Sequence, residues 1–374
     1  MIVLRPAWME VDLDAIASNC ELVRRHVGAD KAIIAVVKAN AYGHGAAPVA
    51  RRLVDCGAKL LAVALLQEAV ELRDAGIDSP ILVLGAPDCS EAEGFVEYGV
   101  QSPITNAEFA RALSEAGTKV GCDAVPCQVK IDSGMGRQGV RADEAAELGR
   151  LIRGLGNLDV RGVFSHFACA GSDHEFTCCQ TDTSVRAMQA FTEALGKPVP
   201  LRHLANSGGV SRCPESWLEG VRPGAILYGI TPPDSSEGLP GTRQAMTLKA
   251  RIVCLKRLLP GETVGYGRTY TAQDSARVAI LPIGYADGYP RSLSNNADVL
   301  VGGKRCPVVG RVSMDAIVVD VTAVPEARMG DESVLIGAQG EEFISVDELA
   351  RRADTIVQEI VARMSARLPR VYGG

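Results

Sequence analysis

Short apolar runs, many of them β-branched, alternate with amphipathic stretches through the first two-thirds of the chain. Short apolar runs bounded by turn residues are typical of buried strands, and stretches with apolar residues at helical spacing are typical of helices. We predict strands at residues 32–38, 60–64, 81–84, 101–104, 127–131, 160–166, 202–205 and 225–228. Helical patterns lie between them, including residues 46–56, 66–75, 107–116, 143–153 and 183–195.

The strand–helix alternation predicts parallel strands joined by right-handed crossovers. Eight such repeats are the number that closes a (β/α)8 barrel. Several helical patterns end at a glycine in the C-cap position, namely Gly57, Gly76, Gly117 and Gly196. A doubly wound open sheet is the alternative, although no GxGxxG sequence follows the first predicted strand. We therefore predict an α/β fold that begins with an N-terminal TIM-like (β/α)8 barrel.

The alternation stops at residues 231–243, TPPDSSEGLPGTR, where turn-forming residues favour a domain boundary. The later segments are mainly β-rich, at residues 249–257, 277–281, 298–301, 305–309, 316–321 and 332–336. Only residues 346–352 and 355–364 have a helical pattern. We predict a barrel domain at residues 12–235 and a smaller, mainly β domain at residues 236–374, joined by an N-terminal strand at residues 1–11.

The composition is that of an ordinary globular protein, with 47% hydrophobic and 22% charged residues in a chain of 374. The net charge of −6 is spread along the chain without a long run of one sign, which excludes a general nucleic-acid binder. No apolar stretch approaches the length of a membrane span, and the N-terminus lacks the apolar core of a signal peptide. We expect a cytoplasmic protein that contacts neither membrane nor nucleic acid.

The eleven cysteines are an odd number and contain no CxxC pair. This spacing indicates neither a disulfide framework nor a zinc site. Cys178 and Cys179 are adjacent, but neighbouring residues do not easily bind one metal ion. We expect reduced thiols that pack as small apolar side chains, and no metal.

The most informative local sequence is VVKANAYGHG at residues 36–45, where the first predicted strand ends in Lys38. Barrel enzymes place catalytic groups at the carboxyl ends of their strands. A lysine there can instead extend into solvent. Here it is preceded by apolar residues and followed by Tyr42 and a glycine-rich loop that lets backbone approach a ligand. Lys38 is therefore a candidate catalytic residue.

At these residues the chain resembles the alanine racemases, pyridoxal phosphate (PLP) enzymes that combine a barrel with a C-terminal β domain. The resemblance extends from about residue 6 to residue 372 and rests on separated motifs. These are AVVKANAYGHG, VKIDSGMGRQG, FSHFACA, HLANSGG, VRPGAILYG, VGYGRTYTA, PIGYADGYPR and GRVSMD. It implies an amino-acid racemase that interconverts L- and D-alanine and supplies D-alanine for peptidoglycan.

The resemblance also implies how PLP is held. Lys38 is expected to bind it as a Schiff base, which requires an amine desolvated enough to be neutral near pH 7. The cofactor phosphate and its surroundings are expected to involve Tyr42, Asn206, Ser207 and the backbone amides of Gly224 and Ala225. Barrels commonly bind phosphate in the loops after strands seven and eight, which agrees with these positions.

Arg222 is the position that the resemblance places against the pyridine nitrogen of PLP. Many PLP enzymes have an acid there, which keeps the nitrogen protonated. An arginine essentially never gives up its proton, so the nitrogen should stay unprotonated, which favours prompt reprotonation of the substrate over side reactions. We expect His166 to hydrogen-bond Arg222 and hold it in place.

Racemisation requires a proton to leave one face of Cα and return to the other, which one side chain cannot do. The family pattern supplies Lys38 for one face and Tyr266 for the other, and in the family this tyrosine comes from the partner subunit. The resemblance therefore implies a homodimer with shared active sites. A tyrosine with its ordinary pKa of about 10 is a poor base at neutral pH, so we expect the His166–Arg222 pair to give it a cationic neighbourhood.

Substrate binding is assigned by the same resemblance. Arg137 matches the residue that binds the substrate carboxylate, for which a bidentate guanidinium is suited. Lys130 matches a lysine that many members carry as a carbamate, which would orient Arg137. Three further residues match positions of the partner subunit that shape the entrance and substrate pocket, namely Tyr285, Met314 and Asp315.

One departure from the family raises an alternative. Ala366 stands where several alanine racemases have a tyrosine near the cofactor and substrate. Loss of the phenol should enlarge the pocket, so a serine or broad-specificity racemase is the alternative function. A single-domain PLP barrel of vitamin B6 homeostasis would lack the second domain with GYGRTY and SMD. The active-site motifs of a decarboxylase on a related fold are absent.

Overall fold

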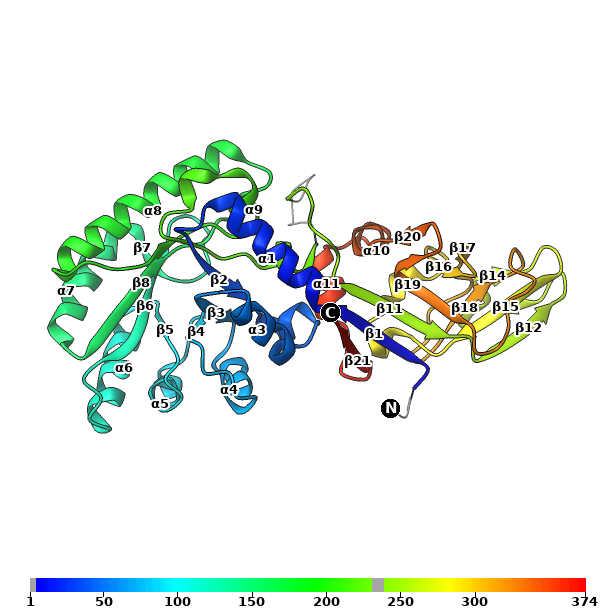
Figure 1. The fold of residues 1–374 in the computed structure, drawn as a ribbon, viewed down its shortest axis with the longest axis horizontal. Coiled ribbons are helices and arrows are strands. Elements are labelled where there is room, and N and C mark those ends of the chain that lie inside the picture. Colours follow the sequence, from blue (N-terminus) through cyan, green and yellow to red (C-terminus); the bar gives the residue numbers. More distant parts are fainter. Residues whose placement is uncertain (1–4, 231–238) are drawn as a thin grey trace.

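The computed structural model describes residues 5–230 and 239–374. Figure 1 shows two parts side by side along the long axis of the molecule, one rich in helices and one mainly of strands. The chain begins in the strand-rich part, builds the helical part next and returns to finish where it began.

The helical part is a barrel of parallel strands. Hydrogen bonding arranges them in the order β4-β3-β2-β10-β9-β8-β6-β5. A parallel bridge between Leu82 and Gln101 joins the two ends of this order and closes the ring, and β7 (Val140–Arg141) extends β6 at one side. The ring consists of β2 (Ala32–Val36), β3 (Leu60–Val63), β4 (Ile81–Val83), β5 (Ser102–Ile104), β6 (Val125–Asp132), β8 (Leu158–Phe164), β9 (Arg202–His203) and β10 (Gly220–Val221). The predicted (β/α)8 barrel is confirmed.

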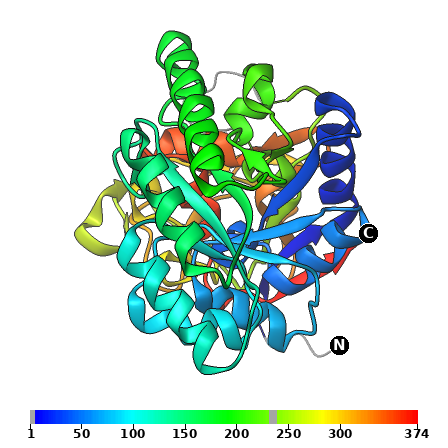
Figure 2. The ribbon, with the colours of Figure 1, turned by 90° about the vertical axis from the view of Figure 1, so that its left-hand side faces the viewer.

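Helices surround this ring, as the end-on view in Figure 2 shows. They are amphipathic; α3, for example, buries Val49, Ala50 and Leu53 on one face and exposes Arg51. The surrounding helices are α1 (Leu13–Val27), α3 (Ala46–Asp55), α4 (Leu66–Asp74), α5 (Ala92–Glu97), α6 (Ala107–Lys119), α7 (Ala145–Leu155), α8 (His174–Leu195) and α9 (Ser207–Arg212).

Three local predictions in the barrel were wrong. Residues 225–228 form a short 3-10 helix, η4 (Ala225–Tyr228), and the eighth strand is the earlier β10. A short buried apolar run does not reveal by its pattern alone whether it is strand or helix. Gly117 does not end a helix; it lies inside α6, where an added Cβ would lie 2.4 Å from Val125 Cγ2. Helix α8 begins at His174, nine residues before its predicted start, because Asp173 caps it.

The second part is built mainly from strands, as predicted. Its main sheet contains β1 (Ala7–Asp12), β11 (Met246–Arg251), β16 (Asp298–Val301), β17 (Lys304–Pro307), β19 (Glu332–Gln339), β20 (Glu342–Ile344) and β21 (Arg370–Gly373). Smaller sheets contain β12 (Cys254–Leu258), β15 (Ala276–Leu281) and β18 (Ile317–Asp320), and the pair β13 (Thr263–Val264) and β14 (Tyr270–Thr271). Two helices follow, α10 (Val346–Ala353) and α11 (Val357–Ala362). The predicted single strand at 249–257 is wrong, because the chain changes sheet between β11 and β12.

Both ends of the described chain belong to the main sheet of the second part. Strand β1 pairs antiparallel with β11 and parallel with β21, so it lies between them. The first eight residues of the predicted boundary segment, 231–238, lie outside the described residues. Within the two described ranges, no helix combines the length and apolar character needed to cross a bilayer.

The thiols are all free. Four of them are buried, Cys20, Cys127, Cys213 and Cys306, and pack as small apolar side chains. Cys178 and Cys179 are exposed on α8, so the expectation that the cysteines serve as apolar packing is wrong for these two.

Candidate active site

A cavity of about 240 Å³ lies at the carboxyl ends of the barrel strands. The segments that follow β2, β8, β9 and β10 supply most of its wall, and Gln358 of α11 completes it. Catalytic groups of barrel enzymes occupy this end. Eight residues singled out from the sequence line this one cavity: Lys38, Tyr42, His166, Asn206, Ser207, Arg222, Gly224 and Ala225.

Lys38 begins a left-handed turn. It lies two residues beyond β2 and opens α2 (Lys38–Tyr42). The four residues from Ala39 to Tyr42 have φ between 51° and 54°, although none is glycine. The left-handed region costs roughly 1–2 kcal/mol per residue, so the surroundings must hold this turn. The sequence predicted only a glycine-rich loop that lets backbone approach a ligand here.

Glu68 of α4 accepts a hydrogen bond from the start of that turn and stabilises it. Its carboxylate accepts hydrogen bonds from the backbone N–H of Ala39 at 2.6 Å, of Ala64 at 2.7 Å and of Leu65 at 3.2 Å. The Glu68 carboxylate thus links the residue after Lys38 to the two residues that follow the neighbouring strand β3. Sequence reasoning missed Glu68; the only signal was an acid in the first turn of a predicted helix, which is typical of capping.

The Lys38 amine lies in a cationic, partly buried setting. Burial lowers its pKa, and the positive charges of Arg137 and Arg222 lower it further, while Glu68 acts in the opposite direction. Desolvation and nearby like charges both favour the neutral amine. Both effects shift Lys38 toward the neutral form that a nucleophile or a proton acceptor needs.

Arg222 is buried and its guanidinium is held from several sides. It donates to His203 Nδ1 at 2.6 Å, to the carbonyl of His203 at 2.9 Å and to that of Leu204 at 2.9 Å. It also donates to the carbonyl of Ser165. The expected contact with His166 Nδ1 is present but long, at 3.4 Å. The principal histidine partner is therefore His203 rather than His166.

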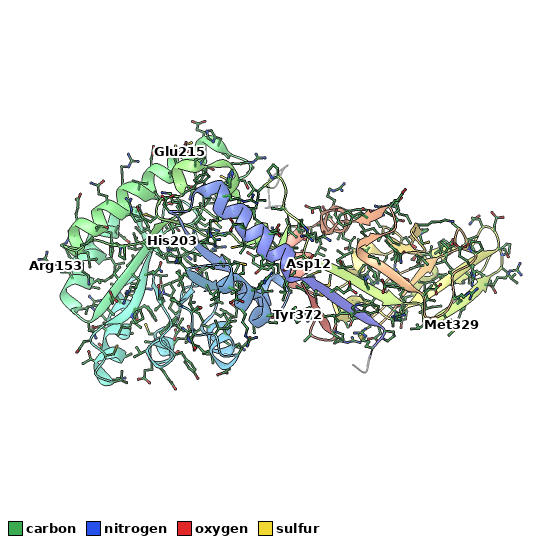
Figure 3. The ribbon with its side chains drawn as sticks, in the orientation of Figure 1. Asp12, Arg153, His203, Glu215, Met329 and Tyr372 are labelled. Atoms are coloured by element: carbon green, nitrogen blue, oxygen red, sulfur yellow. The ribbon has the colours of Figure 1, made fainter. Side chains whose placement is uncertain are left out.

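His203 was missed, although it lies in the HLANSGG motif. It is fully buried within the barrel (Figure 3) and stacks on Phe164 with ring centroids 5.0 Å apart. Since Arg222 can only donate, Nδ1 must accept, and Nε2–H then donates to Gln128 Oε1 at 2.6 Å. Burial and Arg222 hold the pKa of His203 well below its usual range. A neutral histidine of fixed tautomer thus orients the guanidinium.

Backbone N–H groups and hydroxyls gather beside Lys38. Ser207 Oγ accepts from Gly224 N at 3.0 Å and from Ile226 N at 3.4 Å. A Cβ added to Gly224 would lie 2.7 Å from Tyr42 Oη, so the tyrosine reaches the backbone only because this residue is glycine. Burial raises the pKa of Tyr42 to about 12, which keeps its phenol a hydrogen-bond donor.

Lysine and arginine contribute the charged side chains of the cavity lining, so its charge is positive. Its lining carries Lys38 and Arg222, and none of the described lining residues is an aspartate or glutamate. Asn206 caps the adjoining α9 through a bond from Gly209 N at 3.0 Å. Cationic side chains, hydroxyls and backbone N–H groups together are the donors that bind a phosphate group.

Lys130 and Arg137 lie next to this cavity without lining it. Lys130 is 5% exposed and donates to the carbonyl of Leu84 at 2.8 Å and to Gln138 Oε1 at 2.9 Å. Burial, followed by the charges of Arg222, Arg137 and Lys38, lowers its pKa to about 7. Arg137 is exposed on the loop after β6.

Four predicted residues lie in the second part instead. Tyr266 begins the 3-10 helix η5 (Tyr266–Arg268) between β13 and β14 and is 72% exposed. Tyr285 and Met314 are 42% and 51% exposed, and Asp315 is exposed as well. None of the four lines the cavity, so within one chain Tyr266 is not among the residues that line it together with His166 and Arg222. Ala366 is also exposed and outside the cavity lining.

Comparisons with known proteins agree with this division. The model of the alanine racemase N-terminal domain matches residues 11–232, and that of the C-terminal domain matches residues 245–372. The alanine racemase of Halothermothrix orenii is 41% identical over 371 residues, which covers 99% of this chain and 97% of that protein. The alanine racemase of Symbiobacterium thermophilum is 42% identical, with 99% and 98% covered.

Solved structures give the same result. The alanine racemase of Streptomyces lavendulae superposes with a TM-score of 0.92 at 35% identity, covering 100% of this chain and 98% of that one. The alanine racemase of Bacillus anthracis, solved with bound L-Ala-P, has a TM-score of 0.91 at 34% identity, with 100% and 96% covered.

Proposed function

The chain belongs to the alanine racemase family, and on that premise we propose that PLP, held in the barrel cavity, is the cofactor with which it interconverts L- and D-alanine. It is an isomerase. The observation that carries the proposal is the joining of Lys38, Arg222 and a set of phosphate-binding donors in one cavity that lacks carboxylates.

The residues present suit PLP. Lys38 would attach to it, because its amine has a lowered pKa. Tyr42, Ser207 and the backbone around Gly224 and Ala225 would hold the phosphate. When bound, PLP draws electrons from Cα of the substrate and so acidifies its proton.

Arg222 would face the ring nitrogen. Its guanidinium keeps its proton because several carbonyls and His203 Nδ1 already accept from it. It therefore has no proton to give to a ring nitrogen beside it. We propose that this limits charge delocalisation and favours return of the proton to Cα, as racemisation requires.

The proton would be moved by Lys38 on one face of Cα and by Tyr266 of a second copy on the other. Within one chain, Tyr266 is 72% exposed and lies outside the cavity lining. A symmetric dimer would bring each Tyr266 to the other chain's cavity. We therefore propose a homodimer with shared active sites.

A complementation experiment tests the shared site. Lys38→Ala and Tyr266→Phe chains are each inactive alone under this proposal. In a mixed dimer, one site combines both changes and the other is wild type. Random mixing should restore about one quarter of wild-type activity, because half of the dimers are mixed and each has one of two sites intact. No recovery after confirmed subunit exchange would contradict the shared site.

Lys130 and Arg137 would serve the substrate carboxylate. With a pKa of about 7, Lys130 has a substantial neutral fraction at pH 7, and a neutral amine adds CO₂ to form a carbamate with release of a proton. The resulting negative charge would attract the guanidinium of Arg137 and orient it. Mass spectrometry under CO₂-enriched conditions, with Lys130→Arg as the control, tests the modification.

Alanine is the substrate that the relatives favour, since those described above are alanine racemases. The serine alternative rested on a pocket enlarged at Ala366, and the cavity of this chain does not include that residue. A coupled assay of L-alanine and L-serine side by side, with an absorbance spectrum for PLP, tests both points. A kcat/KM for serine within a thousandfold of that for alanine would revive the alternative.

The cellular role follows from the product. We propose that the enzyme works in the cytoplasm and supplies D-alanine for peptidoglycan. We also propose the domain boundary between residues 235 and 236, which falls between the ranges matched by the two family models. Loss of growth that D-alanine restores in a deletion strain would test the role.

A further inference from the structure

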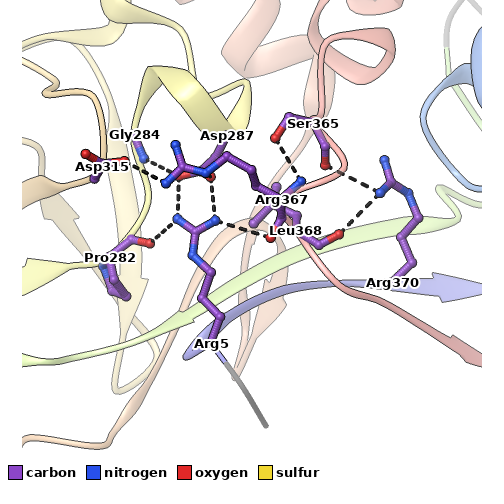
Figure 4. A network of polar contacts seen from close by, with 9 residues as sticks. All are labelled: Arg5, Pro282, Gly284, Asp287, Asp315, Ser365, Arg367, Leu368 and Arg370. Carbon is purple, nitrogen blue, oxygen red and sulfur yellow. Dashed lines mark hydrogen bonds and ion pairs between the residues drawn. The ribbon is translucent and has the colours of Figure 1, made fainter.

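A fully buried carboxylate joins both ends of the chain to the loops of the second part. Asp287 receives two hydrogen bonds from Arg5, at 2.5 Å and 2.6 Å, and one from Gly284 N at 3.0 Å (Figure 4). Arg367, near the C-terminus, lies 3.4 Å from the same carboxylate. Asp287 itself is 0% exposed. A buried charge is tolerated only when it is paired and hydrogen-bonded, so these partners are essential to it.

The turn that contains Asp287 is attached to the loop at residues 313–315. Tyr285 N donates to the carbonyl of Ser313 at 3.0 Å, and Ala286 N donates to that of Met314 at 3.0 Å. A Cβ at Gly284 would lie 2.2 Å from the Ser313 carbonyl oxygen, so only glycine allows this contact. The two segments therefore form one unit, from which Tyr285 and Met314 project into solvent.

Arg367 ties this unit to the C-terminal segment. It donates to Asp315 at 2.6 Å while it faces Asp287, and Ser365 N donates to the carbonyl of Asp287 at 3.0 Å. The same segment reaches the Lys38 turn, because Arg370 donates to the carbonyl of Gly43 at 2.8 Å. Two arginines, Arg5 and Arg367, thus balance the charges of Asp287 and Asp315. Arg370, a third arginine of the network, connects the C-terminal segment to the barrel rim.

We propose that Asp287 is a positioning residue that, through Arg5 and Arg367, fixes Tyr285 and Met314 in the orientation in which they enter the cavity of a second copy. This inference rests on the proposed racemase with shared sites. Asp287 touches neither cofactor nor substrate. It acts on how well the completed pocket holds alanine, so its loss changes KM more than kcat and leaves cofactor binding intact.

The test is Asp287→Asn, which keeps the shape of the side chain and removes its charge. We expect KM for L- and D-alanine to rise about tenfold, because displaced Tyr285 and Met314 would no longer complete the pocket that holds alanine; tenfold corresponds to about 1.4 kcal/mol of binding. The absorbance of bound PLP and the dimer content should stay as in wild type. A KM within twofold of wild type would overturn the proposal.

A matched control separates positioning from general destabilisation. Glu348 is another poorly exposed carboxylate of the second part, paired with Arg305 at 2.8 Å and Arg352 at 2.9 Å, and these ion pairs involve no residue of the Tyr285 unit. Glu348→Gln should lower the melting temperature to a similar degree and leave KM unchanged. An equal rise of KM in both variants would refute the specific role of Asp287.

A second variant covers the case in which Asp287→Asn does not fold. Arg367→Gln leaves the Arg5–Asp287 pair in place and removes the bridge to Asp315, so KM should rise about threefold to tenfold. An unchanged KM would refute the proposal. An inactive wild-type enzyme would refute the proposed function itself, whereas an active wild type with unaltered variants would refute the positioning role alone.

Discussion

The barrel cavity and the exposed face of the second part differ in how much of their order one chain supplies. Arg222 lines the cavity and donates a hydrogen bond of 2.6 Å to the buried His203 behind it. On the second part, Tyr266 and Met314 are more than half exposed. The cavity is thus complete within one chain, whereas the exposed face of the second part, which carries Tyr266 and Met314, presents phenolic and apolar groups to solvent.

Under the proposed function, this difference means that cofactor binding needs only the folded barrel, whereas proton transfer also needs a second copy of the chain. The donors of the cavity come from four neighbouring barrel strands, so folding of the barrel alone brings them together. We propose that the exposed side chains of the second part instead meet a second copy of the chain, as the shared-site dimer requires. The proposed enzyme therefore needs folding for its cofactor and association for its second base.

The largest effect is expected from Lys38→Ala, which changes the barrel cavity. Loss of the amine removes the attachment point of PLP and one proton carrier, so activity should fall by about 10⁴-fold or more. The absorbance band of PLP joined to the protein should disappear with it. Circular dichroism should remain that of wild type. Persistence of that band would show that another lysine carries the cofactor.

Tyr266→Phe tests the exposed face of the second part. The cofactor spectrum should be unchanged, because Tyr266 does not line the cavity of its own chain. Loss of one acid–base group should lower kcat by about 10²–10⁴-fold. In deuterated solvent, exchange of the Cα proton should be strongly impaired from one enantiomer and much less from the other. Equal loss from both enantiomers would contradict the two-base assignment.

The same two regions show what the sequence could and could not predict. Alternating apolar runs predicted the barrel, and motif positions after its strands predicted eight residues of one cavity. His203 and Gln128 were not predicted from the sequence, because a hydrogen-bonded pair of buried polar side chains inside a barrel has no local sequence signature. The left-handed turn after Lys38 depends on Glu68, about thirty residues away in the chain. No pattern in the turn itself carries that tertiary contact.

Arg222→Met measures how much the hydrogen bonds of Arg222 at the barrel cavity stabilise the folded chain. It leaves the carbonyls of Ser165, His203 and Leu204 without their donor in a buried site. The free energy of unfolding should fall by about 2–5 kcal/mol. Arg141→Met, which breaks the exposed pair with Asp143, should change it by less than about 1 kcal/mol. Similar losses in both variants would contradict the special status of Arg222.

The smallest effect is expected from the titration of Lys130 beside the cavity. Its pKa is about 7 in the folded chain and about 10.4 when the chain is unfolded. Between these values the unfolded chain binds a proton that the folded chain lacks, so the free energy of unfolding rises with pH. The slope from this group is at most about 1.4 kcal/mol per pH unit, and below pH 7 its full penalty remains.

Lys130→Met removes that slope, so the comparison is between two pH profiles. In CO₂-free buffer, stability of wild type relative to the variant should increase from pH 7 to pH 9, as followed by denaturant unfolding. The constant offset from the lost bonds to Leu84 and Gln138 does not affect this trend. Bicarbonate should then stabilise wild type relative to the variant, because the variant lacks the Lys130 amine that would form the carbamate. Parallel profiles would show that Lys130 does not change its charge in this range on folding.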